Sequence, residues 1–166
     1  MIKIAAFYNG GFSSFLTKIF TGCGAHHIAF IFVYDSIEVI NAQFVIYEMD
    51  VRRRARIIDK ETLRKKISKG DIVLYDCPVE VSRQYLENET LYDSDRYGVI
   101  DYLLFVLNPI KKFLGLRIKN HQGMICSEMV NDDLIYNKWE SPWHLNGEPP
   151  SPCDLASVLK KSEFTV

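Results

Sequence analysis

The sequence feature that most constrains the fold is the apolar run at residues 28–34, Ile-Ala-Phe-Ile-Phe-Val-Tyr. It is rich in β-branched and aromatic residues, which favour strands, and it shows almost no alternation with polar residues. Strands of this kind are buried on both faces, so the run predicts a central strand with further layers on either side of its sheet. It is far too short to span a lipid bilayer.

Other segments are expected to supply the rest of the sheet and its covering helices. Further strands are expected at Ile2–Tyr8, Ile37–Ile40, Phe44–Met49 and Asp71–Asp76. Apolar residues with a helical period predict helices at Thr62–Ile67, after Pro78, after Ser94, at Ile110–Leu114 and from Cys126 to about Lys138, with a last short turn opened by Pro152. The chain shows no repeat and no linker, and its 166 residues fit one α+β domain, residues 1–166.

The composition limits the class of function and the expected location. A formal net charge of −1 argues against a specific nucleic-acid partner, because nucleic-acid-binding domains usually carry a basic excess. The four cysteines, Cys23, Cys77, Cys126 and Cys153, are widely spaced without a C-x-x-C pair, which fits neither a disulfide framework nor a zinc ribbon. The first residues lack the longer apolar core of a signal peptide. We therefore expect a cytoplasmic protein with reduced thiols.

The stretch Gly123–Val130 contains the strongest candidate for chemistry. An apolar approach leads to Cys126, where a helix is expected to begin, and Glu128 in its first turn suits the positive end of the helix dipole. A thiol at a helix N-terminus lies near unpaired backbone N–H groups, which favour the reactive thiolate. Most single cysteines are inert, so the position alone does not decide between a nucleophile and a buried structural residue.

A base and an orienting carboxylate are available on neighbouring strands. His27 directly precedes the apolar run, and Glu48 lies on the following strand segment, so antiparallel pairing would place the carboxylate beside the imidazole. A structural histidine and a solvent-facing glutamate are the common alternatives. His121 is a second candidate base near Cys126, and Cys23 with His27 could form a local metal pair, although no further ligands are spaced for tetrahedral zinc.

Several short segments, spread along nearly the whole chain, together form an ordered set of motifs. They are residues 7–11 and 16–21, His27–Phe30, Tyr47–Val51, Tyr97–Gly98, Ile125–Val130 and Ser151–Leu155. In this order they resemble the opening loop and helix, the histidine strand, the glutamate segment and the "Y-G", "C-S-E-L-V" and "P-x-D-L" motifs of one family. The family is the permuted papain-like cysteine hydrolases, the YiiX-like branch of the NlpC superfamily, which is distantly similar to lecithin:retinol acyltransferase-type enzymes.

The resemblance implies a circularly permuted papain-like (NlpC-like) fold, with an antiparallel sheet packed against helices. It assigns Cys126 as the nucleophile, His27 as the general base and Glu48 as the third, orienting residue, without a metal or cofactor. Non-permuted relatives place the cysteine helix before the histidine strand, and the reversed order here leaves the geometry of such a site unchanged. His26 stands where the family often has serine and so remains the alternative base. No Gly-Val follows Glu48, which alters the expected substrate groove.

The implied activity is that of a bacterial or phage thiol hydrolase or acyltransferase that cleaves an amide or ester through a Cys126 acyl-enzyme. The expected substrate is a small peptide, an amide or a lipid-like molecule, and we favour an intracellular acyl or amide substrate over cell-wall peptide. One alternative is a catalytically silent binding or effector module on the same fold, such as a phage-encoded factor. Another is a protein that contacts an anionic surface through Arg52, Arg53, Arg54 and Arg56, although such runs are usually solvated strand edges.

Overall fold

A computed structural model describes residues 2–9, 18, 23–32, 43–49, 53–92, 125–143 and 150–162. Within these residues, five strands form one sheet in the order β4-β3-β2-β1-β5, and every neighbouring pair is antiparallel. The strands are β1 (Ile2–Phe7), β2 (His27–Phe32), β3 (Gln43–Met49), β4 (Arg53–Asp59) and β5 (Ile72–Asp76). Together with the helices they confirm the expected α+β class.

The strand β2 lies in the middle of the sheet, between β1 and β3. Its residues 28–31 are fully buried, because apolar layers cover both faces of the sheet. The expectation of a central, doubly covered strand is therefore confirmed.

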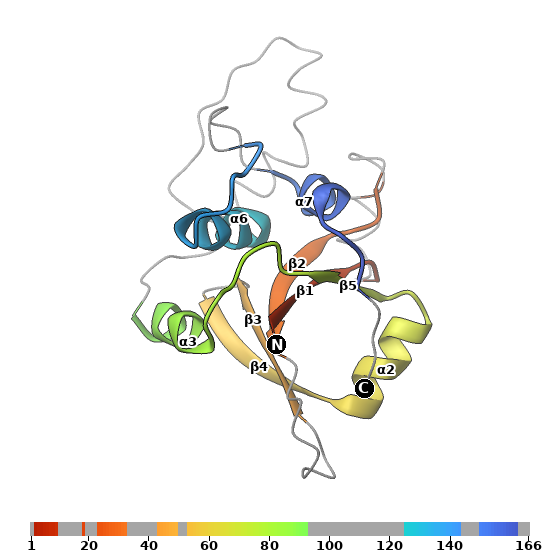
Figure 1. Ribbon diagram of the computed structural model, residues 1–166. Coiled ribbons are helices and arrows are strands. Elements are labelled where there is room, and N and C mark those ends of the chain that lie inside the picture. Colours follow the sequence, from red (N-terminus) through yellow and green to blue (C-terminus); the bar gives the residue numbers. More distant parts are fainter. Residues whose placement is uncertain are drawn as a thin grey trace.

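Alternating side chains divide the sheet into two apolar faces. One face contains Ile28, Phe30 and Met49 and packs against α6 (Cys126–Tyr136), α7 (Pro152–Val158) and Leu86 of α3 (Arg83–Tyr92). The other face contains Ala29, Ile31 and Ile46 and packs against Leu63 of α2 (Lys60–Ser68). Figure 1 shows α6 and α7 on one side of the curved sheet and α2 on the other.

Polar residues fix where two of these helices begin. The Asp59 carboxylate accepts a hydrogen bond of 2.8 Å from the Thr62 N–H at the start of α2. At α7, the Ser151 hydroxyl accepts from the Asp154 N–H while the Asp154 carboxylate accepts from the Ser151 N–H, both at 2.9 Å. This capping box places Pro152 at the first helical position, so the short turn expected there is a seven-residue helix.

The structure differs from expectation after Met49, where a polar stretch forms a full strand. The strand β4 pairs with β3 along its whole length, from Gln43 opposite Asp59 to Met49 opposite Arg53. This polar segment can form a strand because the arginines of β4 form ion pairs with carboxylates of the protein, as described below. The expected strand at residues 37–40 and the helices expected after Ser94 and at residues 110–114 lie outside the described residues. No helix in the described part of the chain is long and apolar enough to cross a membrane.

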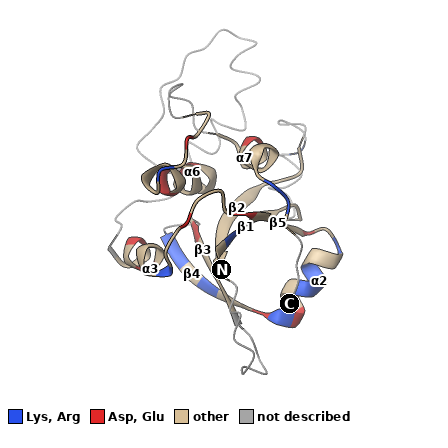
Figure 2. Cartoon of the chain, viewed as in Figure 1, with Lys and Arg blue, Asp and Glu red and all other residues tan. Residues whose placement is uncertain are grey.

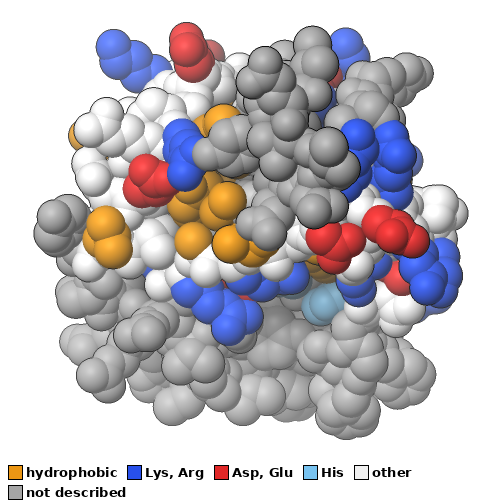
Figure 3. Space-filling view, turned by 90° about the horizontal axis from the view of Figure 1, so that it is seen from below, with side chains coloured by type: hydrophobic (Ala, Val, Ile, Leu, Met, Phe, Trp, Pro, Cys, Tyr) orange, Lys and Arg blue, Asp and Glu red, His pale blue; other side chains and the backbone are white. Residues whose placement is uncertain are grey.

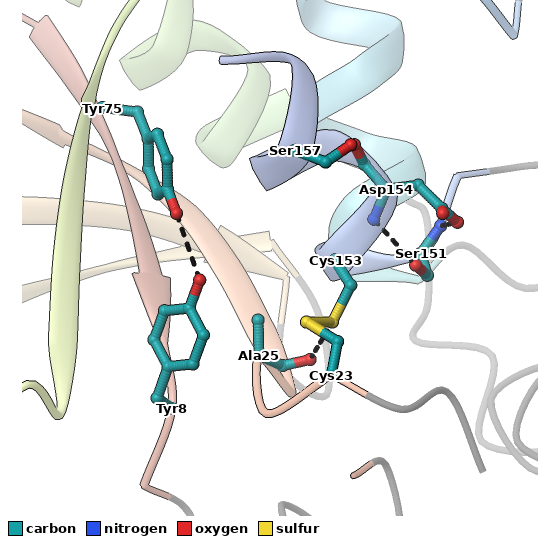
Figure 4. Close-up of a disulfide and its surroundings, with 8 residues drawn as sticks. All are labelled: Tyr8, Cys23, Ala25, Tyr75, Ser151, Cys153, Asp154 and Ser157. Atoms are coloured by element: carbon teal, nitrogen blue, oxygen red, sulfur yellow. Dashed lines mark hydrogen bonds between the residues drawn. A yellow bond between two sulfur atoms is a disulfide. The ribbon is translucent and has the colours of Figure 1, made fainter. Parts of the chain in front are cut away.

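A disulfide joins Cys23 to Cys153 across 130 positions of sequence (Figure 4). It connects the segment that leads into β2 to the first turn of α7, and the carbonyl oxygen of Ala25 lies 3.4 Å from the Cys153 sulfur. The expectation of reduced thiols is therefore wrong for these two residues, whereas Cys77 and Cys126 are free. Sequence spacing gave no sign of the pair, because only the tertiary fold brings the two segments together.

Candidate active site

Cys126 is the first residue of α6 and is only 2% exposed. The capping position belongs to Ile125, which has an extended backbone and no polar side-chain atom with which to bind the N–H groups of the first turn. The Glu128 carboxylate instead accepts from the Ile125 N–H at 3.4 Å, at the positive end of the helix. Cys126 therefore begins a helix, as the sequence predicted.

His27 is the first residue of β2, and both other predicted site residues influence its ring. Its Nε2 lies 3.0 Å from Oε2 of Glu48. Burial lowers the pKa of His27, but the charge and hydrogen bond of Cys126, followed by those of Glu48, outweigh burial and raise it to about 9. Because Nε2 is taken up by Glu48, Nδ1 is the ring atom that remains to exchange a proton with the thiol. The structure thus brings Cys126, His27 and Glu48 together at the end of β2.

His26 lies next to His27 but differs from it in its contacts. Its backbone N–H donates to the carbonyl of Phe7 at 3.0 Å, and its buried Nδ1 has no hydrogen-bond partner in the part of the chain that is described. Burial and then the charge of His27 lower the pKa of His26 to about 4. Cys126 raises the pKa of His27 but is not among the causes that shift the pKa of His26, so electrostatics favour His27 as the base. The catalytic role of His27 stays a prediction.

Glu48 is a buried carboxylate, 3% exposed, that is bound on both sides. Its Oε2 meets His27, while its Oε1 accepts from Nε of Arg54 at 3.1 Å and from Nε of Arg56 at 2.7 Å. Burial raises the pKa of Glu48, but His27 and then Arg56 overcome this effect and lower it to about 2. Glu48 is therefore ionised at neutral pH in spite of its burial.

Arg53, which precedes Arg54 on β4, points to the opposite face of the sheet, because side chains alternate along a strand. Arg53 donates through Nη1 to both carboxylate oxygens of Asp133 at 3.0 Å, and the Tyr85 hydroxyl donates to Oδ1 of the same group at 2.9 Å. Asp133 lies seven residues after Cys126 on α6. This buried contact set ties the cysteine helix to β4 and α3.

The roles of these arginines were missed by sequence reasoning, which treated residues 52–56 as one charged run. Three of the four are bound to carboxylates: Arg53 to Asp133, and Arg54 and Arg56 to Glu48. Arg52 lies outside the described residues. Figure 2 shows the basic colouring of β4, and Figure 3 shows Lys and Arg side chains in a row on a face where a histidine is also exposed. A strand glutamate opposite an arginine is the only sequence signal for such pairing.

The other candidate sites receive no support. Cys23 is oxidised in the disulfide, so the alternative of a local metal pair of Cys23 and His27, already disfavoured by the sequence, is wrong. No group of three metal-binding side chains occurs among the described residues, and His121 lies outside them. A pocket lined by Ile2, Phe32 and Cys77 lies at the opposite ends of β1 and β2 from Phe7 and His27.

Comparison with known proteins adds no family assignment. No protein-family model matches the chain, and no curated protein is significantly similar to it. The membership in the permuted papain-like hydrolases therefore remains a prediction based on the ordered motifs.

Proposed function

We propose that this protein is a cysteine hydrolase or acyltransferase with a permuted papain-like fold, acting on an amide or ester. The observation that carries this proposal is the position of His27, which lies 3.0 Å from the Glu48 carboxylate and whose pKa is raised by Cys126 at the start of α6. A nucleophile, a base and a group that orients the base are the minimum set for covalent acyl transfer.

The proposed reaction proceeds through an acyl-enzyme. His27, already protonated at neutral pH, holds the proton removed from the Cys126 thiol, and the thiolate attacks the substrate carbonyl carbon. Backbone N–H groups at the start of α6 stabilise the resulting oxyanion, because no capping side chain competes for them at Ile125. The tetrahedral intermediate collapses, the leaving amine or alcohol takes the proton from His27, and water or another acceptor then releases the acyl group. Glu48 keeps the imidazolium oriented throughout.

The substrate class we favour is an intracellular acyl or amide compound. The alternative of an anionic partner bound through β4 is less favoured, because Arg53, Arg54 and Arg56 already bind carboxylates of the protein. The direct test offers short-chain acyl esters, phospholipid and muropeptide side by side to the wild type and to Cys126→Ala. Cleavage of muropeptide alone would overturn the substrate preference while leaving the reaction class intact.

The reaction class itself is tested by alkylation with iodoacetamide at neutral pH, followed by mass spectrometry of each cysteine. Cys126 should be modified selectively, although it is more buried than Cys77, because only Cys126 lies beside a protonated imidazole. Burial raises the pKa of the Cys77 thiol, which makes it the internal control. Equal, slow labelling of both thiols would support a catalytically silent module instead.

The expected cytoplasmic location also stays a prediction. Structural disulfides are uncommon in the reducing cytosol, so the pair Cys23–Cys153 weighs against it. Blocking free thiols before cell lysis and counting blocked cysteines would decide the matter. Two blocked cysteines mean that the disulfide exists in the cell, and four mean a reducing location.

A further inference from the structure

Four successive strands of the sheet each contribute one side chain to a closed series of contacts around the candidate base. Arg56 of β4 donates to Oε1 of Glu48 of β3 at 2.7 Å, and Oε2 of Glu48 meets His27 of β2 at 3.0 Å. The His27 ring lies 5.2 Å from the ring of Phe7 of β1, its register partner. The guanidinium of Arg56 lies 5.5 Å from the centre of the same Phe7 ring, which closes the series.

The contact with Phe7 distinguishes Arg56 from Arg54, the other arginine that binds Glu48. Arg54 is the direct cross-strand partner of Glu48 and needs no special geometry to reach it. Arg56 lies two residues further along β4 and contacts both neighbours of His27, the carboxylate and the aromatic ring. A flat sheet would hold β4 and β1 three strand spacings apart, so the contact depends on the curvature visible in Figure 1.

We propose that Arg56 is a positioning residue of the active site, which fixes the Glu48 carboxylate toward His27 and limits the negative charge that reaches the imidazole. The inference rests on the proposed function, because it assigns Arg56 a part in preparing the base. Arg56 acts through Glu48 and Phe7 and touches neither the thiol nor the substrate carbonyl in this scheme.

The sign of the electrostatic effect follows from the groups that face His27. These are Cys126 from α6, Glu48 from β3 and the adjacent His26, with Arg54 and Arg56 of β4 acting behind Glu48. Removing the Arg56 cation while Arg54 still holds Oε1 leaves more net negative charge beside the imidazole. A protonated His27 is then favoured, so its pKa should rise, on the order of half to one pH unit for a partly exposed charge at this range.

The experiment is the pH dependence of iodoacetamide alkylation of Cys126, which requires no knowledge of the substrate. When His27 loses its proton, the adjacent thiolate loses its ion-pair partner and its reactivity changes. The alkylation rate of Cys126 therefore shows an inflection at alkaline pH. Arg56→Gln should move this inflection upward, and Arg56→Lys, which keeps the cation, should restore most of the wild-type position. Arg64→Gln removes the same formal charge from an exposed position on α2 and should leave the inflection unchanged.

A double-mutant cycle separates positioning through Glu48 from a direct effect. In a Glu48→Gln background, Arg56→Gln should shift the inflection by less than half of its effect in the wild type. Thermal unfolding of each variant identifies any that fail to fold, and Phe7→Leu then tests the same closed series from its other side, with the inflection again expected to move.

The outcomes distinguish the two proposals. A wild type without selective Cys126 labelling overturns the proposed function. A wild type with the inflection, but unchanged values in Arg56→Gln and Phe7→Leu, overturns the positioning role of Arg56 and leaves the function standing. Equal shifts in both backgrounds of the cycle also overturn it, since Arg56 would then act without Glu48.

Discussion

Loss of the Cys23–Cys153 disulfide should destabilise the protein substantially. The bond closes a loop across 130 sequence positions, and the chain-entropy relation for a loop of about this length gives about 5 kcal/mol at 25 °C. Measured effects usually fall below that relation, so we expect the free energy of unfolding to fall by about 2–5 kcal/mol in Cys23→Ser/Cys153→Ser. For a chain of this length, the midpoint of thermal unfolding should fall by about 5–20 °C.

The assay is urea unfolding of the oxidised wild type, the double-serine variant and the wild type reduced with a phosphine. The reduced wild type and the double variant should unfold at the same lower urea concentration. Cys77→Ser is the matched control, because Cys77 is a free thiol and its replacement creates no open loop. Addition of the phosphine should leave the double variant unchanged.

Two results would refute this reasoning. One is a change of less than about 1 kcal/mol between oxidised and reduced wild type, which would mean that the bond constrains little of the unfolded ensemble. The other is destabilisation of Cys77→Ser as large as that of the double variant, which would assign the loss to thiol replacement.

Four further predictions concern the candidate site. Cys126→Ala should abolish turnover without loss of folding, whereas Cys77→Ala should retain it; turnover by Cys126→Ala would exclude the proposed nucleophile. His27→Gln should reduce kcat/KM by at least about 10³-fold and His26→Gln by much less, and the reverse order would reassign the base. Because Cys126 is the largest cause that raises the pKa of His27, Cys126→Ala should lower that pKa from about 9, as followed by imidazole NMR, and an unchanged titration would contradict the contact. Since that pKa lies above the usual 6.5, His27 should stabilise the fold below pH 6.5 and lose this contribution as the pH rises through about 9, and His27→Gln should flatten this part of the stability profile.

The sequence predicted the parts of the fold that depend on local pattern. The unbroken apolar run at residues 28–31 marked the central strand, and the helix start at Cys126 followed from its apolar approach and from Glu128. His27 and Glu48 could be placed side by side because they lie on consecutive antiparallel strands. Their contact requires only strand adjacency, which a short connection between β-rich segments indicates.

The remaining features depend on contacts between distant segments, for which a single sequence has no local signal. Arg53, Arg54 and Arg56 appeared as one polar run, yet alternation along β4 directs the first toward Asp133 and the other two toward Glu48. The pairing of Cys23 with Cys153 depends on how α7 docks, not on cysteine spacing. In each case the sequence contains both partners, but it does not predict that the fold brings them into contact.

The order of the candidate site residues along the chain has a consequence for when the candidate site is assembled. Phe7, His27, Glu48 and Arg56 all lie on the first four strands of the sheet, which are consecutive neighbours, whereas Cys126 follows seventy residues after Arg56. Chains are synthesised from the N-terminus, so the strands that carry His27 and Glu48 are complete in sequence long before Cys126 leaves the ribosome. The Cys126 thiol comes beside His27 only when α6 docks against β2. A chain in which α6 has not docked therefore holds Cys126 away from His27, and the candidate site is complete only after this docking.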